Sequence, residues 1–420
     1  MTLRSRKDAT ETAAIPALFN SVRALSTDLT RRLLPEDMML QSMEDASPPK
    51  WHLAHTTWFF EEFILKPRVK GYESPDNRFA FLFNSYYVQA GPRHARDKRG
   101  LVSRPGVATV MDYRARVDEA MRALLAEDRI DAEEIAALTE LGCHHEMQHQ
   151  ELLVTDLLHA FSFNPLLPAY RDPAPAPLAD EIPLAFTSFE GGLVEIGHDG
   201  RGFAFDCEGP RHKTFLEPFL FADRPVTNRE WLGFIEDGGY ASPTLWLMDG
   251  WAARQKGDWT HPLYWWRQDD AWWTYTLRGP QRLDLEAPVT HVSYYEADAF
   301  ARWSGGRLPS EAEHEVVTRE TPIAGNFLES SELRPLPGAG FWGDVWEWTQ
   351  SPFTPYPGFR PPEGAIGEYN GKFMVNQFVL RGGSCATPRA QMRPTYRNFF
   401  YPHQRWQMLG LRLAKDVAHA

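Results

Sequence analysis

Cysteine is scarce in this chain of 420 residues, and its scarcity excludes a disulfide framework. Only Cys143, Cys207 and Cys385 occur, an odd number at wide spacings. Proteins stabilised by disulfides carry many cysteines at short spacings and belong to oxidising compartments. The first residues also lack the apolar segment of a signal peptide. We therefore expect a protein of the reducing cytoplasm.

Long apolar runs and an excess of basic charge are missing as well. No segment reaches the roughly 20 apolar residues that a membrane-spanning helix needs. Lys and Arg number 44 against 56 Asp and Glu, a formal net charge of −12, which disfavours nucleic acid as the main partner. Hydrophobic residues make up 43% of the chain, enough for buried cores, and the length predicts two or three domains.

The first third of the chain has the periodicity of four long helices. Apolar residues recur there at spacings of three and four, and Asp131 followed by Glu134 predicts a capping box at the start of the last helix. The second and third helices are separated by a long connection, which is more often functional than idle. An antiparallel bundle with a long crossover is therefore expected. The expected helices are 17–34, 51–66, 107–127 and 131–160, and the connection is 67–106.

A proline-rich segment divides the chain. Residues 165–183 contain six prolines, which predict a stiff extended linker between domains at 1–164 and 184–420. Beyond the linker, glycine, proline and short alternating segments replace the helical periodicity, and most of the tryptophans occur there. Short helices are expected only at 291–303 and 310–319, each begun by a serine. The whole chain is expected to have an α+β fold.

Histidines in the helical third provide the strongest chemical signal. His145 and His149 lie four residues apart on one face of a helix, close enough to share a metal ion. His55 belongs to the second helix, which can face the fourth across a bundle core. Three histidines leave three open positions on an octahedral metal, an arrangement that suits Fe(II) with its substrate and O2. His52 is a rival ligand, and His144 is expected to be exposed.

The string His145-Glu-Met-Gln-His149 also satisfies the H-E-x-x-H pattern of zinc proteases. In those enzymes the glutamate, here Glu146, is the general base. The extension H-x-x-G-x-x-H does not follow, and the helix runs on to the proline-rich segment. A zinc-dependent hydrolase is the alternative that this string leaves open.

Taken together, the motifs resemble a known family. LAH in the second helix with HEMQH in the fourth resembles the iron-binding, DinB-like four-helix bundle of ergothioneine-biosynthesis sulfoxide synthases. The second half is similar to the formylglycine-generating-enzyme/sulfatase-modifying module, a C-type-lectin-like fold with little regular secondary structure. The motifs that carry this second similarity are GGLVEIG, RPVTNREW, GGRLPSEAE, GDVWEWTQSPF, LRGGSCAT and GLRLAK. The two resemblances cover nearly the entire chain.

The resemblance implies a reaction. A non-haem Fe(II) enzyme uses O2 as co-substrate to join the thiol of γ-glutamylcysteine or cysteine to imidazole C2 of hercynine (N-α-trimethylhistidine), giving a sulfoxide. It implies His55, His145 and His149 as the iron ligands and small molecules as the partners, with the active site between the two halves. A selenium-transferring relative, which makes selenoneine from a selenosugar, shares both modules. A formylglycine-generating enzyme would need two neighbouring cysteine thiolates for copper, and a binding module beside a degenerate bundle is a further alternative.

Two tyrosines in the crossover match one subgroup of this family. Tyr86 and Tyr87 stand where that subgroup has its active-site tyrosines. Chemistry with O2 needs a proton donor beside the metal, and a tyrosine hydroxyl is suited to this. The resemblance therefore implies that Tyr86 or Tyr87 donates the proton.

Other polar residues are candidates for binding the substrates. Gln148, between two histidines of the fourth helix, can bond the substrate imidazole. Arg93 and Arg96, which follow the tyrosines, are expected to bind the carboxylates of the thiol substrate. Lys98 and Arg99 are expected to be surface charges.

In the second half, the resemblance implies that residues after Arg397 approach the metal. Asn398 would bond a carboxylate of hercynine, and Phe399 would face its trimethylammonium group. Phe400 stands where the actinobacterial subgroup has an aspartate for the amino group of γ-glutamylcysteine, so cysteine and γ-glutamylcysteine remain equally possible donors. Asp344 and Glu347 are candidates for a structural Ca²⁺ site.

Overall fold

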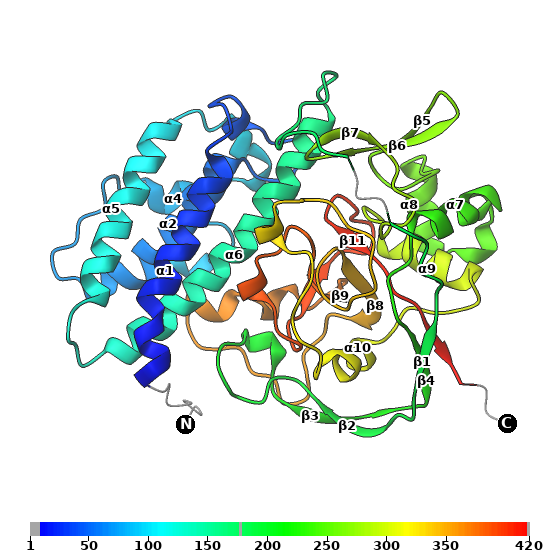
Figure 1. The fold of residues 1–420 in the computed structure, drawn as a ribbon. Helices are drawn as coiled ribbons and strands as arrows, with labels where there is room; N and C mark the ends of the chain where they lie inside the picture. Colours follow the sequence, from blue (N-terminus) through cyan, green and yellow to red (C-terminus); the bar gives the residue numbers. More distant parts are fainter. Residues whose placement is uncertain (1–8, 176–178, 418–420) are drawn as a thin grey trace. The chain divides into compact units, whose positions relative to one another are not determined.

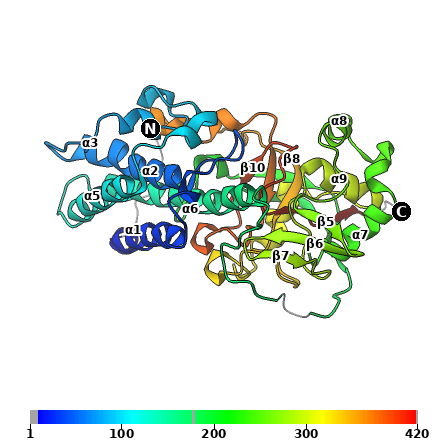
Figure 2. The same cartoon turned by 90° about the horizontal axis from the view of Figure 1, so that it is seen from above.

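Four long helices lie side by side in the first unit of the protein (Figures 1 and 2). We describe the protein from a computed structural model, which covers residues 9–175 and 179–417. The helices agree with the expected periodicity, and their apolar faces bury side chains such as Phe19, Trp58 and Val117. Their bounds are α1 Ala9–Thr30, α2 Pro49–Phe60, α5 Val107–Leu125 and α6 Ala132–Ser162.

The ends of these helices differ from the simple expectation. α2 begins with Pro49 in its first turn and continues as a π-helix, η2, over Glu61–Leu65 and a short α3 over Lys66–Arg68. The predicted capping box at Asp131 is wrong, because its side chain makes no cap hydrogen bond. Its carboxylate instead accepts from Arg129 Nε at 2.8 Å.

The crossover between α2 and α5 is built of short helical turns. They are α4 Phe79–Phe83, η3 Val88–Ala90 and η4 Arg96–Leu101, preceded along the chain by η1 Asp37–Met39. The crossover therefore contains three short helical turns joined by irregular segments.

The chain divides into two compact units, each made of three separate segments of the sequence. Unit 1 contains residues 1–163 together with 200–205 and 361–370, and unit 2 contains 164–199, 206–360 and 371–420. Two short segments from the second half of the sequence thus belong to the helical unit. The later of them includes the 3-10 turn η9, Ala365–Glu368.

Unit 2 is assembled from four small sheets. The strand orders are β1-β4-β12, β2-β3, β5-β6-β7 and β10-β9-β8-β11, and the neighbours are antiparallel except for the parallel pair β8 and β11. The bounds are β1 Phe186–Phe189, β2 Gly192–Ile196, β3 His212–Leu216, β4 Phe219–Ala222, β5 Trp265–Gln268, β6 Ala271–Thr276, β7 Gly279–Arg282, β8 Trp346–Pro352, β9 Phe378–Arg381, β10 Asn398–Phe400, β11 Leu409–Gly410 and β12 Ala414–Asp416.

Short helices connect these strands. They are α7 Asn228–Glu236, α8 Met248–Lys256, α9 Tyr294–Trp303 and α10 Glu311–Thr318. The two helices expected from the sequence are confirmed as α9 and α10, and each begins with a serine capping box, Ser293 with Glu296 and Ser310 with Glu313. The expectation that these are the only short helices is wrong, because α7 and α8 are short helices too, and α7 also begins with a capping box, Thr227 with Glu230.

The described part of the proline-rich segment is bonded to unit 2. Tyr275 donates its hydroxyl to the carbonyl of Pro168 at 2.6 Å, and Arg278 Nη1 donates to the carbonyl of Asp172 at 2.9 Å. Arg334 reaches the carbonyls of Ala174 and Pro175. Instead of a free spacer, the segment up to residue 175 is an extended strap held by its backbone carbonyls.

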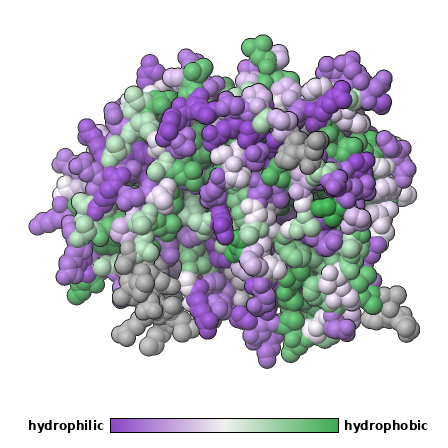
Figure 3. Space-filling view, in the orientation of Figure 1, coloured by the Kyte–Doolittle hydropathy of each residue, from purple (hydrophilic) through white to green (hydrophobic). Residues whose placement is uncertain are grey.

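Among the described residues, no helix is both long and apolar enough to cross a bilayer. On the face shown in Figure 3, hydrophilic side chains are interspersed with smaller apolar areas.

Candidate metal centre

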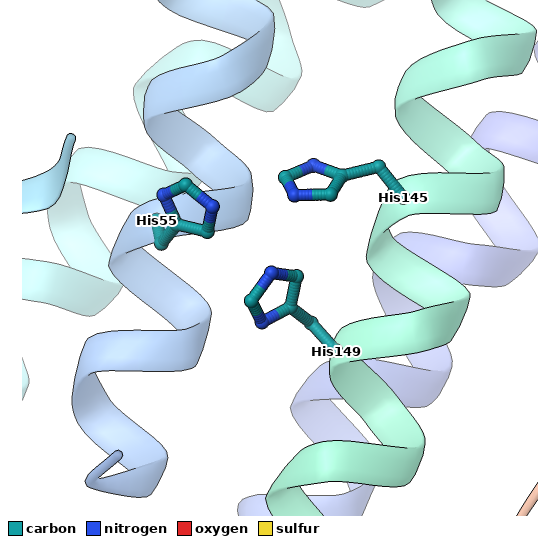
Figure 4. A group of neighbouring side chains, drawn as sticks. All are labelled: His55, His145 and His149. Atoms are coloured by element: carbon teal, nitrogen blue, oxygen red, sulfur yellow. The ribbon is translucent and has the colours of Figure 1, made fainter. Parts of the chain in front are cut away.

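Three histidines from two helices of unit 1 converge on one point (Figure 4). His55 comes from α2, and His145 and His149 come from successive turns of α6. Each offers one nitrogen, and the three nitrogens lie within 4.8 Å of one another. The spacing of four residues puts both α6 rings on one face, and the pairing of α2 with α6 brings the third ring opposite them.

The hydrogen bonds of the rings show which nitrogens are left for a ligand. His55 donates from Nδ1 to the carbonyl of Phe83 at 2.6 Å, and its Nε2 is buried without a protein partner. His149 Nδ1 lies 2.8 Å from His52 Nδ1, which leaves Nε2. Neither nitrogen of His145 has a partner, although the ring is buried. Buried unsatisfied nitrogens are costly, so this cluster fits a bound metal ion.

Burial keeps the three rings in the form that binds metals. It lowers the pKa of His145 to about 3, against the opposing effect of Glu146. Burial, followed by the proximity of His145, lowers the pKa of His55 and of His149 well below the ordinary value. Neutral imidazole is the ligating form, and an all-histidine set suits iron, zinc, copper or nickel.

The two other histidines near the site have contacts of their own. His52, the rival candidate, uses one nitrogen toward His149 and the other toward Asp156 Oδ2 at 3.2 Å. His144 was expected to be exposed, but it is buried and its ring stacks on Phe203, with ring centroids 3.7 Å apart. Phe203 belongs to one of the segments that unit 1 takes from the second half, which is why the sequence did not reveal this contact.

Glu146 is held on a different side of α6. Its carboxylate accepts from Arg23 Nη1 at 2.8 Å, Arg114 Nη2 at 2.5 Å and Ser26 Oγ at 2.5 Å. Burial alone would raise the pKa of Glu146, but Arg114 and Arg23 lower it to about 2. A carboxylate bound by two arginines is not available as the general base of a zinc protease, so the H-E-x-x-H alternative does not fit this arrangement.

Tyr86 and Tyr87 stack on each other beside the histidines. Their ring centroids are 4.5 Å apart, and Tyr86 donates its hydroxyl to the Tyr87 oxygen at 3.4 Å. Tyr87 is fully buried and packs 5.6 Å from Trp58, whose ring in turn lies parallel to His55. Burial, with smaller effects of Tyr86, raises the pKa of Tyr87 well above its ordinary value, so its hydroxyl keeps its proton.

The loop that carries the tyrosines is fastened at two places. Asn84 donates to the carbonyls of Tyr87 and Gly91 and accepts from the Tyr87 amide. Glu368, on η9, accepts from the amides of Val88 at 3.0 Å and Gln89 at 2.8 Å. The tyrosine loop is therefore fixed both by its own sequence and by a carboxylate far along the chain.

Tyr369 is a site residue that the sequence analysis missed. It donates its hydroxyl to Gln148 Oε1 at 2.5 Å, and its ring centroid lies 5.6 Å from that of His145 and 6.3 Å from that of Tyr86. Its ring also stacks on Phe205. Gln148 thus faces the site as expected, but with a partner more than 200 residues away that no local pattern could indicate.

Of the three crossover arginines at positions 93–99, two are exposed and one, Arg99, is buried against the expectation. Arg93 and Arg96 are exposed, and Arg96 Nη2 donates to the carbonyl of Asp45. Arg99, expected on the surface, is buried and stacks over Trp51 at 3.4 Å from the ring centroid. Burial lowers the pKa of Arg99 to about 8. Arg99 lies among other charged residues in the sequence, which indicates a surface position. Its stacking on Trp51 is a contact between distant residues that the local sequence does not reveal.

The remaining expected substrate residues lie in unit 2, on β10. The Asn398 side chain accepts from the Phe399 amide at 2.9 Å. Phe399 stacks on Phe353, with centroids 4.0 Å apart, and Phe400 meets Trp406 edge to face.

Two expectations about metals in unit 2 do not agree with its bonding. Glu347, a candidate for Ca²⁺, is paired with Arg412 and His314. Asp344 accepts from Asn326 Nδ2 and the Leu336 amide. The copper site of a formylglycine-generating enzyme would need thiolates, and Cys207 is buried, which raises the pKa of its thiol and disfavours the thiolate.

Comparison with known families accounts for both halves of the chain. Residues 18–153 match the DinB superfamily, and residues 183–336 and 335–417 match the sulfatase-modifying factor enzyme 1-like domain. These matches confirm the expected order of a helical DinB-like region followed by a module of the formylglycine-generating-enzyme type.

Whole-length relatives agree with this division. The chain is 32% identical to the hercynine oxygenase of Mycobacterium tuberculosis over 88% of its own length and 91% of the relative's. It is 31% identical to the hercynine oxygenase of Mycolicibacterium smegmatis, over 94% and 97%. The similarity to ergothioneine biosynthesis protein 1 of Schizosaccharomyces pombe is 28% identity over 51% of this chain and 28% of that protein.

Proposed function

Because the chain belongs to the hercynine oxygenase family, we propose that it is an Fe(II)- and O2-dependent sulfoxide synthase of ergothioneine biosynthesis. The reaction would join the thiol of cysteine or γ-glutamylcysteine to imidazole C2 of hercynine. The observation that carries the proposal is the group of three neutral histidines whose nitrogens lie within 4.8 Å of one another. No protein group satisfies His55 Nε2 or either nitrogen of His145, whereas one metal ion could bind all three rings.

The residues proposed to hold iron are His55, His145 and His149. Bound iron(II) supplies the redox chemistry that couples O2 to carbon–sulfur bond formation, with coordination positions left open by three protein ligands. The surrounding indoles restrict water: Trp51 stacks on His55 with centroids 4.6 Å apart, and Trp58 lies parallel to the same ring at 5.5 Å.

The tyrosine pair is proposed to hold and deliver a proton. Tyr87 keeps its phenolic proton at neutral pH, and its oxygen accepts from Tyr86, which is only half-buried. A proton lost from Tyr87 can therefore be replaced from Tyr86 through a short path. Glu368 and Asn84 hold the loop so that both hydroxyls stay in register.

Gln148 is proposed to orient the imidazole of hercynine. It lies on α6 between two of the proposed ligands, and Tyr369 holds its Oε1 at 2.5 Å, which fixes the side-chain amide next to the histidines. Following the family resemblance, we also propose that Asn398, Phe399 and Phe400 contribute to substrate binding. For Arg93 and Arg96, exposed guanidinium groups on the tyrosine crossover are suited to the carboxylates of a thiol substrate.

A product assay tests the proposal directly. The protein is loaded with Fe(II) under anaerobic conditions, given hercynine with cysteine or with γ-glutamylcysteine, and exposed to O2. We expect a mass corresponding to a sulfoxide adduct with at least one thiol, and the ratio of the two adducts identifies the donor. If iron-loaded protein gives no adduct with either thiol, the proposal is wrong, and a selenosugar is the next substrate to try.

A further inference from the structure

Behind one of the proposed iron ligands lies a second pair of buried polar side chains. His52, on α2, places its Nδ1 2.8 Å from Nδ1 of His149 and its Nε2 3.2 Å from Oδ2 of Asp156. Both His52 and Asp156 are buried, at 3% and 4% exposure. Asp156 Oδ2 also accepts from the Ser47 amide at 2.8 Å, which fixes the carboxylate.

The chemistry of this chain of contacts determines where each proton lies. Asp156 is a carboxylate and only accepts, so His52 must carry its proton on Nε2 and donate it there. His52 Nδ1 is then a lone pair, which can only accept. His149 must therefore carry its proton on Nδ1, and its Nε2 lone pair is directed away from His52. The opposite order would put a proton on His149 Nε2 and prevent that nitrogen from binding a metal.

We propose that His52 is a positioning residue that, under the control of Asp156, holds His149 in its metal-binding tautomer and orientation. The inference rests on the proposed metal centre and extends it from three residues to five. A carboxylate at the end of the chain increases the electron density on His149, as carboxylate partners of metal-bound histidines do. His52 belongs to the centre without touching the metal.

The other two ligands show why His149 needs this support. His55 is fixed by the carbonyl of Phe83, an acceptor that cannot change its polarity. His145 has no protein partner on either nitrogen. His149 is the ligand of the three that is partly exposed, and its Nδ1 faces the side chain of His52. The partner of His149 is His52, which has two possible tautomers. The direction of the hydrogen bond between them is therefore set by Asp156, which can only accept from His52.

Substitutions at His52 can distinguish its hydrogen bonds from the space that its side chain fills. In His52→Gln the amide oxygen can accept from His149 and the amide NH2 can donate to Asp156, so the polarity of the chain is kept. In His52→Leu the chain is broken with similar volume. His159→Leu is the control for the loss of a histidine from this part of the bundle, because His159 is a half-buried residue of α6 whose Nδ1 lies 2.7 Å from Ser42 Oγ.

The measurement is the dissociation constant for Co(II) and Fe(II), by competition with a chromogenic chelator, with the visible spectrum of the Co(II) protein. We expect His52→Leu to weaken binding by about 10- to 100-fold, the range for partners of metal ligands, and to alter the Co(II) spectrum. His52→Gln should stay within about threefold of the parent, as should His159→Leu. Equal losses in His52→Leu and His52→Gln would mean that His52 acts through packing alone, and the proposal would be wrong.

The role of Asp156 is tested by combining substitutions. Asp156→Ala should weaken binding by about tenfold in the parent but cause no further loss in His52→Leu, because two residues that act in series are not additive. Additive losses would contradict the proposed order. If the parent protein itself bound no metal, the proposed function would fail; a parent that binds metal with His52→Leu unchanged would overturn only the present inference.

Discussion

Two groups of buried polar side chains, one in each unit, use their hydrogen-bonding capacity in opposite ways. In unit 2, Glu311 accepts from Arg397 Nε and from Arg381 Nη2, each at 2.9 Å, and from the Tyr356 hydroxyl at 3.1 Å. In unit 1, the free nitrogens of His55 and His145 are equally buried and have no protein partner.

The difference separates a group that is complete in itself from one that can still take a ligand. A buried polar atom without a partner costs about 1–3 kcal/mol of stability, so it persists only where something else compensates. The network around Glu311 compensates its own charges and needs no ligand. The histidines are left incomplete, although the Glu146 network on the same helix shows that the unit can satisfy even a buried carboxylate.

The largest expected effect comes from replacing one of the histidines that lack protein partners with an apolar residue. His145→Leu should weaken Fe(II) or Co(II) binding by about 1000-fold or more, since loss of a ligand should exceed the 10- to 100-fold typical of its supporting partners. The metal-free protein should become more stable by about 1 kcal/mol, because two unsatisfied nitrogens disappear. Metal titration and thermal unfolding of the metal-free protein measure both. A less stable metal-free variant would show that the histidines contribute to folding.

Breaking the complete group should have the opposite pattern. Glu311→Gln leaves two buried guanidinium groups without their shared carboxylate and should cost about 3 kcal/mol of unfolding free energy, with no change in metal affinity. Denaturant unfolding followed by tryptophan fluorescence measures the loss. Glu195→Gln is the control, because Glu195 forms an exposed pair with Arg211 and should matter by less than about 1 kcal/mol. Similar losses in the two variants would contradict the comparison.

A third prediction tests whether Tyr86 and Tyr87, beside the histidines of unit 1, donate the proton in the proposed reaction. Replacing both Tyr86 and Tyr87 by Phe should keep the iron content and reduce sulfoxide formation by about 100-fold, the lower end for a lost proton donor, or divert turnover to thiol oxidation. Product masses and oxygen consumption report the partition, and the single variants show which hydroxyl donates. Tyr295→Phe, in unit 2, should leave both readouts unchanged. Full sulfoxide synthesis by the double variant would exclude the proton-donor role.

The smallest expected effect concerns Asp344, a buried carboxylate of unit 2 whose charged form lowers the stability of the folded protein. Burial raises the pKa of Asp344 to about 6, above the value of 3.8 expected when unfolded. Between pH 4 and 6 the folded protein therefore binds more protons than the unfolded chain, so its stability falls as the pH rises through that window. Asp344→Asn can keep both hydrogen bonds that Oδ1 accepts, and it should raise stability at pH 7 by about 1 kcal/mol. Melting curves between pH 4 and 7 should lose their slope in this variant, and an unchanged slope would assign it to other groups.

Local patterns account for the parts of the molecule that the sequence predicted. The spacing of His145 and His149 and the serine caps of α9 and α10 depend on residues within one or two turns. The cap expected at Asp131 failed because Arg129 competes for the same carboxylate, a choice that spacing alone does not determine.

The missed residues share one physical cause. Tyr369 on Gln148 and Phe203 on His144 are contacts between segments far apart in the chain. Arg99 likewise becomes buried by stacking on Trp51, which belongs to another helix. Such contacts depend on tertiary packing, and no periodicity or composition near these residues records it.

The two segments that unit 1 takes from the second half also limit how this protein can be recombined. Exchanging the chain with a relative at the proline-rich boundary would transfer all three histidines yet leave Phe205, Glu368 and Tyr369 behind. In the resulting hybrid, the tyrosine loop would come from one protein and the carboxylate that binds its amides, at the position of Glu368, from the other. A functional chimaera must therefore carry 200–205 and 361–370 along with the bundle, whose side chains and tyrosine loop they contact.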